Sequence, residues 1–260
     1  MIILLHTSKT MRLGGRASTP LRNPLLINQT RDLAGYMATL SIEQLMHVMH
    51  VSPTLAAAVA EKYTEWNKEP TRQSPAIDSF IGDIYSGLQA GTFDETDREY
   101  ADAHLRILSG LYGILRPLDG IRPYRLEMGY KLPAKPYANL YTYWGDAVAK
   151  TLPDDEVIIN LAAVEYSRLI TPFIDNSRII SPRFLTRDNK TQEPVFVVVH
   201  AKIARGAFAR WLIASRITSV DKLPEFSDIG YRFDETLSTS SEPVFICDEF
   251  GGKGLSMRLT

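Results

Sequence analysis

The sequence predicts a mixed α/β (α+β) fold in a single compact domain over residues 1–260. Short β-branched apolar runs, typical of buried strands, occur at both ends and in the middle of the chain. Helical segments with recognisable start signals lie between them, without the regular alternation of a βαβ protein. The length of 260 residues exceeds one typical domain and falls short of two. We therefore expect one domain.

Four apolar runs predict buried strands, and they occur at residues 2–5, 157–161, 195–199 and 244–247. Helical periodicity marks residues 54–66 and residues 201–217. Three local signals predict helix starts: the capping-box patterns Ser41 with Gln44 and Thr96 with Glu99, and the N-cap pair Ser52-Pro53.

The composition is that of an ordinary globular protein, with 45% hydrophobic and 23% charged residues and a net charge of −1. Cys247 is the only cysteine, which excludes an intrachain disulfide and a cysteine-based zinc cage. The apolar start is too short for a signal peptide, and no stretch is long enough to span a membrane. We expect a cytoplasmic protein with no membrane partner, no metal and no cofactor.

Charge is segregated along the chain although its total is near zero. Residues 41–100 contain ten acidic and four basic side chains, whereas residues 178–216 contain eight basic and two acidic ones. A neutral protein with this pattern can present a phosphate-binding face, because local potential acts over about 8–10 Å. The acidic block is also a candidate surface for a protein partner, whose identity the sequence does not indicate.

Residues 104–129 combine apolar residues with four glycines and several arginines. Gly110 and Gly113 allow a tight turn whose backbone amides approach a phosphate, and arginine forks match phosphate oxygens. The same pattern suits a helix C-cap followed by two proline turns, and the two interpretations stay open. The candidate phosphate contacts in this segment are Arg116, Arg122 and Arg125.

A second basic segment lies in the predicted helix at residues 201–217. Lys202, Arg205 and Arg210 have no acidic residue three or four positions away, which is unusual for a merely solvated helix face. Gly206 lowers helix propensity and indicates close approach of a phosphate backbone or a neighbouring helix. Lys9, directly after the first strand, is a further candidate anion contact.

No sequence motif of a metal site, a nucleophile or a dinucleotide site is present. His47 and His50 share a helix face without a third ligand, so they indicate a structural pair rather than a metal site. Asp83, Asp146 and Glu165 are candidate general acids or bases if the fold brings them together. Each equally suits an ion pair with an arginine.

Several segments, in this order, resemble the bacterial YaaA family of peroxide-stress proteins. The first loop reads His-Thr-Ser-Lys-Thr where the family has Ser-Pro-Ala-Lys-Thr, so the Lys-Thr pair is kept. The matching segments span nearly the whole chain: residues 8–10, 80–88, 104–128, 140–146, 158–161, 165–166, 201–210 and 230–234.

The resemblance implies a compact mixed α/β fold with a positively charged cleft and a helix-hairpin-helix element. It also implies binding to double-stranded and branched DNA and a cytoplasmic role in limiting DNA damage during peroxide stress, without an established catalytic activity. Two turns are candidates for the hairpin, at residues 109–113 and 51–53, and the acidic surroundings of the second favour the first.

Two function hypotheses follow. In the first, a DNA-binding stress protein contacts backbone phosphates through one basic cleft, independently of base sequence. In the second, an enzyme acts on a nucleotide, a nucleobase or damaged DNA with Asp83, Asp146 or Glu165 as acid or base. The first hypothesis places seven side chains in the cleft: Lys9, Arg116, Arg122, Arg125, Lys202, Arg205 and Arg210.

Overall fold

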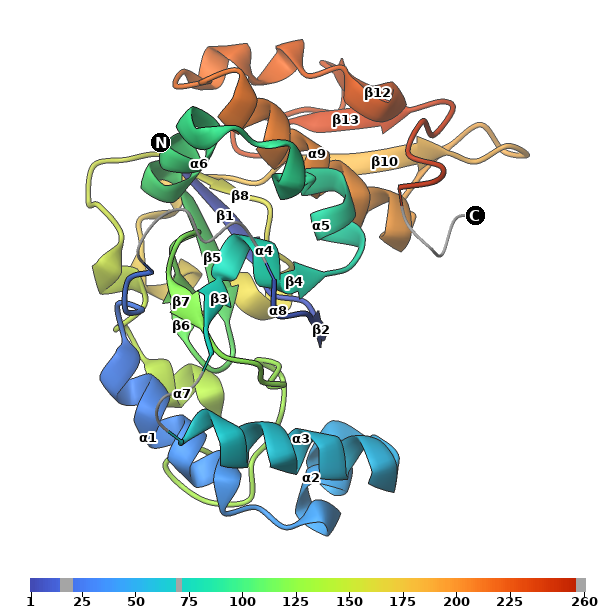
Figure 1. Ribbon diagram of the computed structural model, residues 1–260. Coiled ribbons are helices and arrows are strands. Elements are labelled where there is room, and N and C mark those ends of the chain that lie inside the picture. Colours follow the sequence, from blue (N-terminus) through green and yellow to red (C-terminus); the bar gives the residue numbers. More distant parts are fainter. Residues whose placement is uncertain (15–20, 69–71, 256–260) are drawn as a thin grey trace.

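The fold is described from a computed structural model, which describes residues 1–14, 21–68 and 72–255. A five-stranded sheet with the order β6-β5-β1-β8-β9 occupies its centre (Figure 1). β1 runs parallel to both of its neighbours, β9 runs parallel to β8, and β6 is an antiparallel edge strand. The strands of this sheet are β1 (Ile2–His6), β5 (Leu105–Ser109), β6 (Gly113–Leu115), β8 (Ile158–Asn160) and β9 (Ile179–Ile180).

β1 is the central strand, and its sequence explains this position. All five of its residues are buried, as a strand with neighbours on both edges and cover on both faces requires. Ile3 lies opposite Leu105 of β5 on one side and Ile159 of β8 on the other. Pairing with β8 ends at Leu4, and pairing with β5 continues to His6, where β1 ends.

A second sheet with the order β11-β10-β13-β12 lies at the top of Figure 1 and packs against the long helix α9 (Val198–Ala214). Phe184 stacks on Phe245 with ring centroids 5.5 Å apart, on the face that joins the main core. The alternate residues Leu185, Val244 and Ile246 form a separate small cluster, as a two-residue repeat requires. The strands are β10 (Arg183–Arg187), β11 (Pro194–Val195), β12 (Tyr231–Asp234) and β13 (Val244–Cys247).

The remaining helices cover the central sheet and its lower end. α1 (Ile27–Ala38), α2 (Ile42–Met49), α3 (Pro53–Trp66) and α7 (Leu140–Trp144) gather at the bottom of Figure 1. The other elements are α4 (Ala76–Ser79), α5 (Asp83–Leu88), α6 (Glu95–His104), α8 (Val164–Ser167), β2 (Thr10–Met11), β3 (Ser74–Pro75), β4 (Phe80–Ile81) and β7 (Gly120–Ile121). Short 3-10 helices connect them: η1 (Ala90–Thr92), η2 (Ala149–Thr151), η3 (Thr171–Phe173), η4 (Asn176–Arg178), η5 (Val220–Glu225) and η6 (Asp228–Gly230).

The predicted mixed α/β class is confirmed, and so are most of the predicted elements. The strands at residues 2–5, 157–161 and 244–247 correspond to β1, β8 and β13. Ser41 and Gln44 form a complete capping box at α2, and the Ser52 hydroxyl accepts a hydrogen bond from the Leu55 amide at α3. These signals predict well because caps act within one helical turn.

One predicted strand and the predicted cap of one helix are wrong. The run at residues 195–199 forms a strand only at Val195, and Val198 already begins α9, whose buried face overrides the strand preference of three consecutive valines. Thr96 and Glu99 do not cap α6. The N-cap is Asp94, two residues before Thr96. Its carboxylate accepts a hydrogen bond from the Asp97 amide at 2.8 Å.

Helices α5 and α9 cross in close contact, and a glycine on each makes the crossing possible. A Cβ atom at Gly206 would lie 1.8 Å from the Ile84 carbonyl oxygen, and one at Gly87 would lie 2.0 Å from the Ile203 carbonyl oxygen. The close approach predicted for Gly206 is therefore to a neighbouring helix. This crossing holds the first residue of α5, Asp83, beside α9.

Candidate functional site

The strand order places a pocket where ligands bind in open α/β sheets. The chain leaves β1 and forms β5 on one side, then returns to form β8 on the other, which makes the carboxyl end of β1 a topological switch point. A cavity of about 300 Å³ opens there. Its lining comes from five parts of the chain: residues 6–10 at and after the end of β1, residues 81–85 from β4 into α5, Glu127, residues 163 and 165–166 at the start of α8, and Lys202 of α9.

His6, the last residue of β1, forms part of the floor of the pocket. Its ring stacks on Tyr166 with centroids 4.7 Å apart, and its Nδ1 accepts a hydrogen bond from the Ala163 amide at 3.2 Å. Burial, together with the charges of Arg205 and Lys202, lowers the pKa of His6 to about 3. The imidazole is thus neutral at pH 7, and its single proton is on Nε2 because Nδ1 is an acceptor.

The loop after β1 forms one wall of the pocket. Lys9 makes an ion pair with Glu127, 2.8 Å between Nζ and Oε2, and this pair raises the pKa of Lys9. The Ser8 hydroxyl donates to the Ile81 carbonyl and accepts the Thr10 amide, which ties the loop to the short β2–β4 pair. The loop is held by hydrogen bonds rather than by a glycine-rich turn, so it does not form a phosphate loop of the Walker type.

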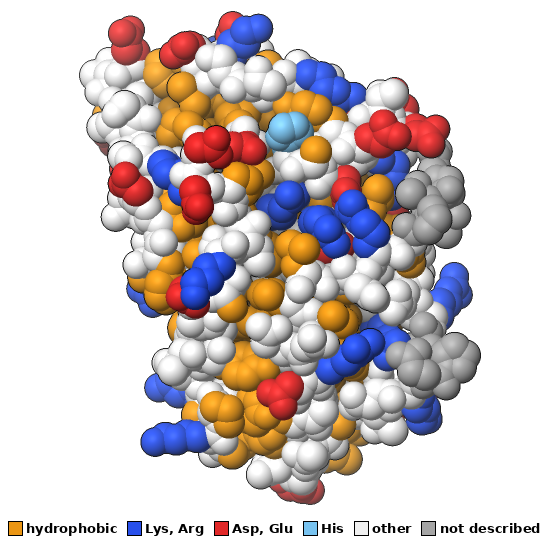
Figure 2. Space-filling view, turned by 90° about the vertical axis from the view of Figure 1, so that its left-hand side faces the viewer, with side chains coloured by type: hydrophobic (Ala, Val, Ile, Leu, Met, Phe, Trp, Pro, Cys, Tyr) orange, Lys and Arg blue, Asp and Glu red, His pale blue; other side chains and the backbone are white. Residues whose placement is uncertain are grey.

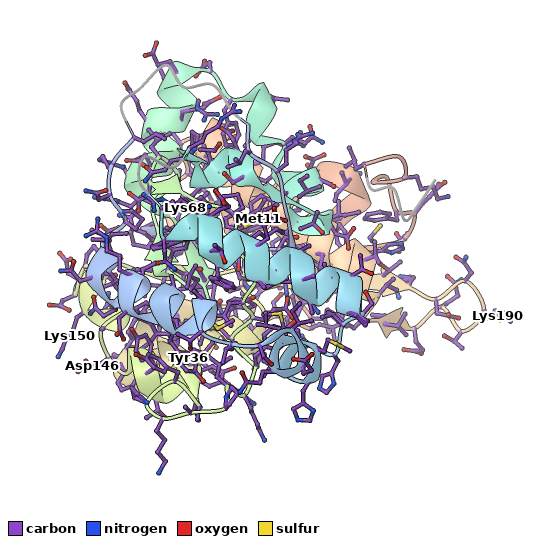
Figure 3. The ribbon with its side chains drawn as sticks, turned by 60° about the horizontal axis from the view of Figure 1, so that its bottom comes forward. Met11, Tyr36, Lys68, Asp146, Lys150 and Lys190 are labelled. Carbon is purple, nitrogen blue, oxygen red and sulfur yellow. The ribbon has the colours of Figure 1, made fainter. Side chains whose placement is uncertain are left out.

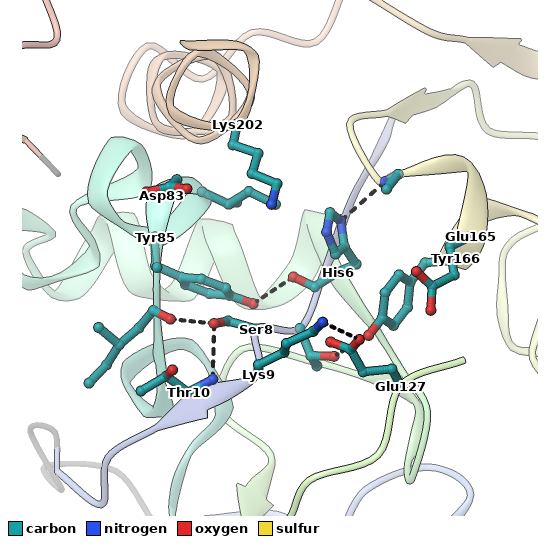
Figure 4. Close-up of a pocket in the computed structure, with 15 residues that line it drawn as sticks. His6, Ser8, Lys9, Thr10, Asp83, Tyr85, Glu127, Glu165, Tyr166 and Lys202 are labelled. Carbon is teal, nitrogen blue, oxygen red and sulfur yellow. Dashed lines mark hydrogen bonds and ion pairs between the residues drawn. The ribbon is translucent and has the colours of Figure 1, made fainter. Parts of the chain in front are cut away.

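Lys202 and Asp83 enter the pocket from the α5–α9 crossing. In Figure 4 the Lys202 side chain descends from α9 into the space between Asp83 and His6. Arg205, one turn further along α9, is half-buried and lies within electrostatic reach of His6. Neither Lys202 nor Arg205 makes an ion pair or a side-chain hydrogen bond with any residue in the described ranges. Burial lowers the pKa of Arg205.

Glu165 lies on the opposite wall, in α8. Its Oε1 accepts the Gly129 amide at 2.8 Å, and its backbone carbonyl accepts the Tyr141 hydroxyl at 2.8 Å. Three carboxylates (Asp83, Glu127 and Glu165) and two ammonium groups (Lys9 and Lys202) therefore line the cavity, beside a neutral histidine. With all five groups ionised, the lining carries one net negative charge.

The structure thus brings together some of the predicted site residues. Lys9, Lys202, Asp83 and Glu165 line one pocket, and Arg205 lies beside it. Arg125 is close enough to Lys9 to affect its pKa, and the Arg125 Nε is buried without a hydrogen-bond partner in the described part of the chain. Five separate stretches of sequence meet at this pocket, and no local sequence pattern indicates that they do.

Three predicted arginine contacts are engaged inside the fold instead. Arg116 pairs with the buried Asp119 and donates to the Asn23 carbonyl at 3.0 Å. The Arg122 guanidinium is buried over the Trp66 ring and donates to carbonyls at the C-terminal end of α3, where a cation is favourable.

Arg210, the third of these arginines, donates to the Gln89 side chain at 2.8 Å and pairs with Asp228.

Asp146 is half-exposed and pairs with Lys150 at 2.8 Å, in the part of the molecule labelled at the left of Figure 3. Asp146 does not line the pocket, so it does not converge with Asp83 and Glu165.

The favoured hairpin turn is not a helix-hairpin-helix. Residues 109–113 join two strands, β5 and β6, and Gly113 pairs with Ser109 across this β-hairpin. The turn is buried: a Cβ atom at Gly110 would lie 2.4 Å from the Leu126 carbonyl oxygen. Its glycines therefore serve close packing. The other candidate turn, at residues 51–53, does lie between two helices, α2 and α3.

Sequence reasoning gave no role to His6, Tyr85 or Glu127, although all three line the pocket. One signal was available for His6, the first polar residue at the end of a buried strand, where ligands meet a parallel sheet. Tyr85 and Glu127 carry no comparable signal, because their positions depend on the α5–α9 crossing and on the chain after β7. In the described ranges no cluster of three or more His, Cys, Asp or Glu side chains suits a metal ion.

The predicted positively charged cleft is not evident on the side of the molecule shown in Figure 2. Lys and Arg side chains form a small central group there, and Asp and Glu side chains lie beside them. Several basic residues of the segment 178–216 are neutralised locally, such as Arg216 by Asp97 at 2.8 Å. Lys202 and Arg205 are two half-buried cations of this segment that form no ion pair with any described residue.

These features define a mixed α/β protein with a polar pocket at the switch point of a mainly parallel sheet. Across the described ranges, no helix is both long and apolar enough to cross a membrane. The family model described as peroxide stress protein YaaA matches residues 1–237, and the chain belongs to this family, as its sequence predicts.

Two curated relatives match over almost their whole length. A UPF0246 protein of Salinispora tropica is 58% identical over 258 residues, which cover 99% of this chain and 98% of that protein. A UPF0246 protein of a Marinomonas species is 39% identical over 256 residues, which cover 96% of this chain and 98% of the relative.

Proposed function

We propose that this peroxide-stress protein binds duplex or branched DNA in the cytoplasm through backbone phosphates and thereby limits oxidative damage to the DNA. The observation that carries the proposal is the pair Lys202 and Arg205. These cations are one helical turn apart on α9, half-buried, and without an anionic partner in the described ranges. A partly desolvated cation without a counter-charge destabilises the protein, and a bound phosphate removes this penalty.

The surroundings of the pair suit phosphate rather than base recognition at the protein surface. Arginine forks and lysine ammonium groups bind phosphate oxygens without reading sequence. Lys9 lies on the other side of the pocket with Arg125 within electrostatic reach of it, and together they would extend the basic contact surface. Lys9 contributes when its ion pair with Glu127 opens toward the ligand. The turn between α2 and α3 is the remaining candidate for the family's helix-hairpin-helix element.

Charge reversal at Arg205 tests this proposal. Arg205→Glu removes one phosphate contact and adds a repulsion, together roughly 1–3 kcal/mol at moderate salt, which is a five- to hundredfold loss of duplex affinity. Lys202→Glu is expected to act in the same direction. Lys150→Glu, an equal charge change at an exposed residue outside the pocket, is the control. Equal affinity of all three variants and the native protein, or no binding to any duplex or junction, would contradict the proposal.

A second candidate function has one observation in its favour. Asp83 and Glu165 line the same cavity as the neutral His6, an arrangement that suits acid–base catalysis on a nucleotide or nucleobase. The test is mass spectrometry of DNA and nucleotides incubated with the protein. A product that is lost with Asp83→Asn and Glu165→Gln supports an enzyme, whereas unaltered substrates argue against it.

A further inference from the structure

The pocket and the cations at its edge differ in charge, so they suit different parts of one ligand. Asp83, Glu127 and Glu165 line the cavity, where Lys9 is already paired with Glu127 and Lys202 enters from the α9 side. A phosphate inside the cavity would face these carboxylates at close range, which is unfavourable in a partly desolvated site. The unpartnered charge of Lys202 and Arg205 lies on α9, where the anionic part of a ligand is favoured. The interior therefore suits a neutral group that both donates and accepts hydrogen bonds.

The hydrogen-bonding groups of the interior match such a group. His6 is only 7% exposed and lines the cavity, and its Nε2–H makes no hydrogen bond within the described part of the protein. Because Nδ1 is held by Ala163, the ring presents this donor in a fixed orientation beside Tyr166. Carboxylates at Asp83 and Glu165 are acceptors for exocyclic amino or ring N–H groups. A nucleobase edge offers this mixture of donors and acceptors, and the volume of about 300 Å³ is at the lower end for small-molecule sites.

We propose that the pocket receives the base of a single nucleotide that has left the DNA stack, while the adjoining phosphates lie against Lys202 and Arg205. This inference rests on the proposed DNA binding and specifies what is bound. A base must be unpaired and unstacked before it enters, which takes a few kcal/mol in intact duplex and less at a mismatch or bulge. The protein should therefore prefer DNA that contains an unpaired nucleotide over a fully paired duplex.

The test compares two duplexes of equal length, one fully paired and one with a single bulged 2-aminopurine. The bulged duplex is expected to bind at least tenfold more tightly, and its 2-aminopurine fluorescence is expected to rise as the base leaves the stack. Ala163→Phe places a ring in the cavity and is expected to remove both effects. Val164→Phe, at the neighbouring residue that is 67% exposed and outside the pocket lining, is the matched control and should retain them.

The possible results distinguish binding of an unstacked base in the pocket from binding of DNA through its phosphates alone. Equal affinity for the two duplexes without a fluorescence change would show that no base enters the pocket. It would remain consistent with DNA binding through phosphates. Absence of binding to either duplex overturns both. The fluorescence titration of the native protein decides the matter if Ala163→Phe does not fold, because it needs no variant.

Discussion

At the residue scale, His6 is expected to make native stability depend on pH. Its pKa of about 3 in the folded protein is below its ordinary value of 6.5, with burial as the main cause. Between these two values the unfolded chain binds a proton at this residue that the native protein does not bind. Stability is therefore lost as the pH falls below about 6.5, at up to roughly 1.4 kcal/mol per pH unit.

Urea unfolding between pH 7.5 and pH 5 measures this slope. His6→Asn keeps an acceptor for the Ala163 amide but has no titrating group, so its stability should fall less steeply than that of the native protein. A His6 imidazole signal, assigned by its absence in His6→Asn, that titrates near pH 6.5 in the NMR spectrum of the folded protein would refute the prediction.

Cys247 is expected to be inert toward peroxide in the folded protein. Burial, aided by the nearby carboxylates of Asp248 and Glu249, raises the pKa of its thiol to about 11. About one molecule in ten thousand then carries a thiolate at pH 7, and the thiolate is the nucleophile. Thiol titration with a disulfide reagent should show almost no reaction until denaturant is added. Rapid formation of sulfenic acid in the native protein on addition of peroxide, absent in Cys247→Ser, would show that the Cys247 thiol reacts directly with peroxide.

At the element scale, the α5–α9 crossing sets the geometry of the pocket, and its glycines have no room for a larger side chain. Gly206→Ala forces a methyl group against the Ile84 carbonyl, and we expect a loss of about 1–3 kcal/mol of stability despite the better helix propensity of alanine. Gly35→Ala in α1 is the control, because a Cβ atom there meets nothing within 4 Å and should stabilise the helix by about 0.5–1 kcal/mol. Denaturant midpoints of the two variants should shift in opposite directions.

The elements that the sequence predicts correctly are those with local causes. α2 and α3 begin at caps that act within one turn, and β1 and β13 are short apolar runs buried in their sheets. The β5–β6 hairpin was not predicted, because helical and turn readings of its glycines compete until the pairing with β1 is known. Pairing between distant strands is decided by tertiary packing, which a single sequence does not specify locally.

In the candidate site, too, the sequence predicts the features that have local causes and not those that depend on tertiary packing. Lys202 and Arg205 were identifiable because the absence of neighbouring acids is visible within two helical turns. Their placement beside Asp83 and His6 was not, since it depends on the α5–α9 contact and on the order of strands in the central sheet. For Arg122 the local pattern is misleading. Its sequence context predicts a phosphate contact, whereas in the structure it is buried against the end of α3 and has a structural role.

At the scale of the whole molecule, net charge limits how the proposed DNA binding can arise. The net charge of −1 provides little long-range attraction, so affinity must come from a few close phosphate contacts. Arg116, Arg122 and Arg210 are engaged within the fold. The cations proposed for phosphate at or beside the pocket are Arg125, Lys202, Arg205 and, once its ion pair with Glu127 opens, Lys9. The proposed DNA site would therefore make about four phosphate contacts rather than the seven that the sequence suggests.

This number predicts the salt dependence of binding. Each neutralised phosphate contributes about −0.9 to the slope of log K against log salt concentration, so four contacts give a slope of roughly −3.6. Duplex affinity should then fall by about a hundredfold between 50 mM and 200 mM salt. Loss of one contact in Lys202→Ala should reduce the slope by about one, while Lys150→Ala should leave it unchanged. A slope near −6 would mean that the arginines held inside the fold are released on binding, and a slope near zero would mean that phosphate contacts do not drive it.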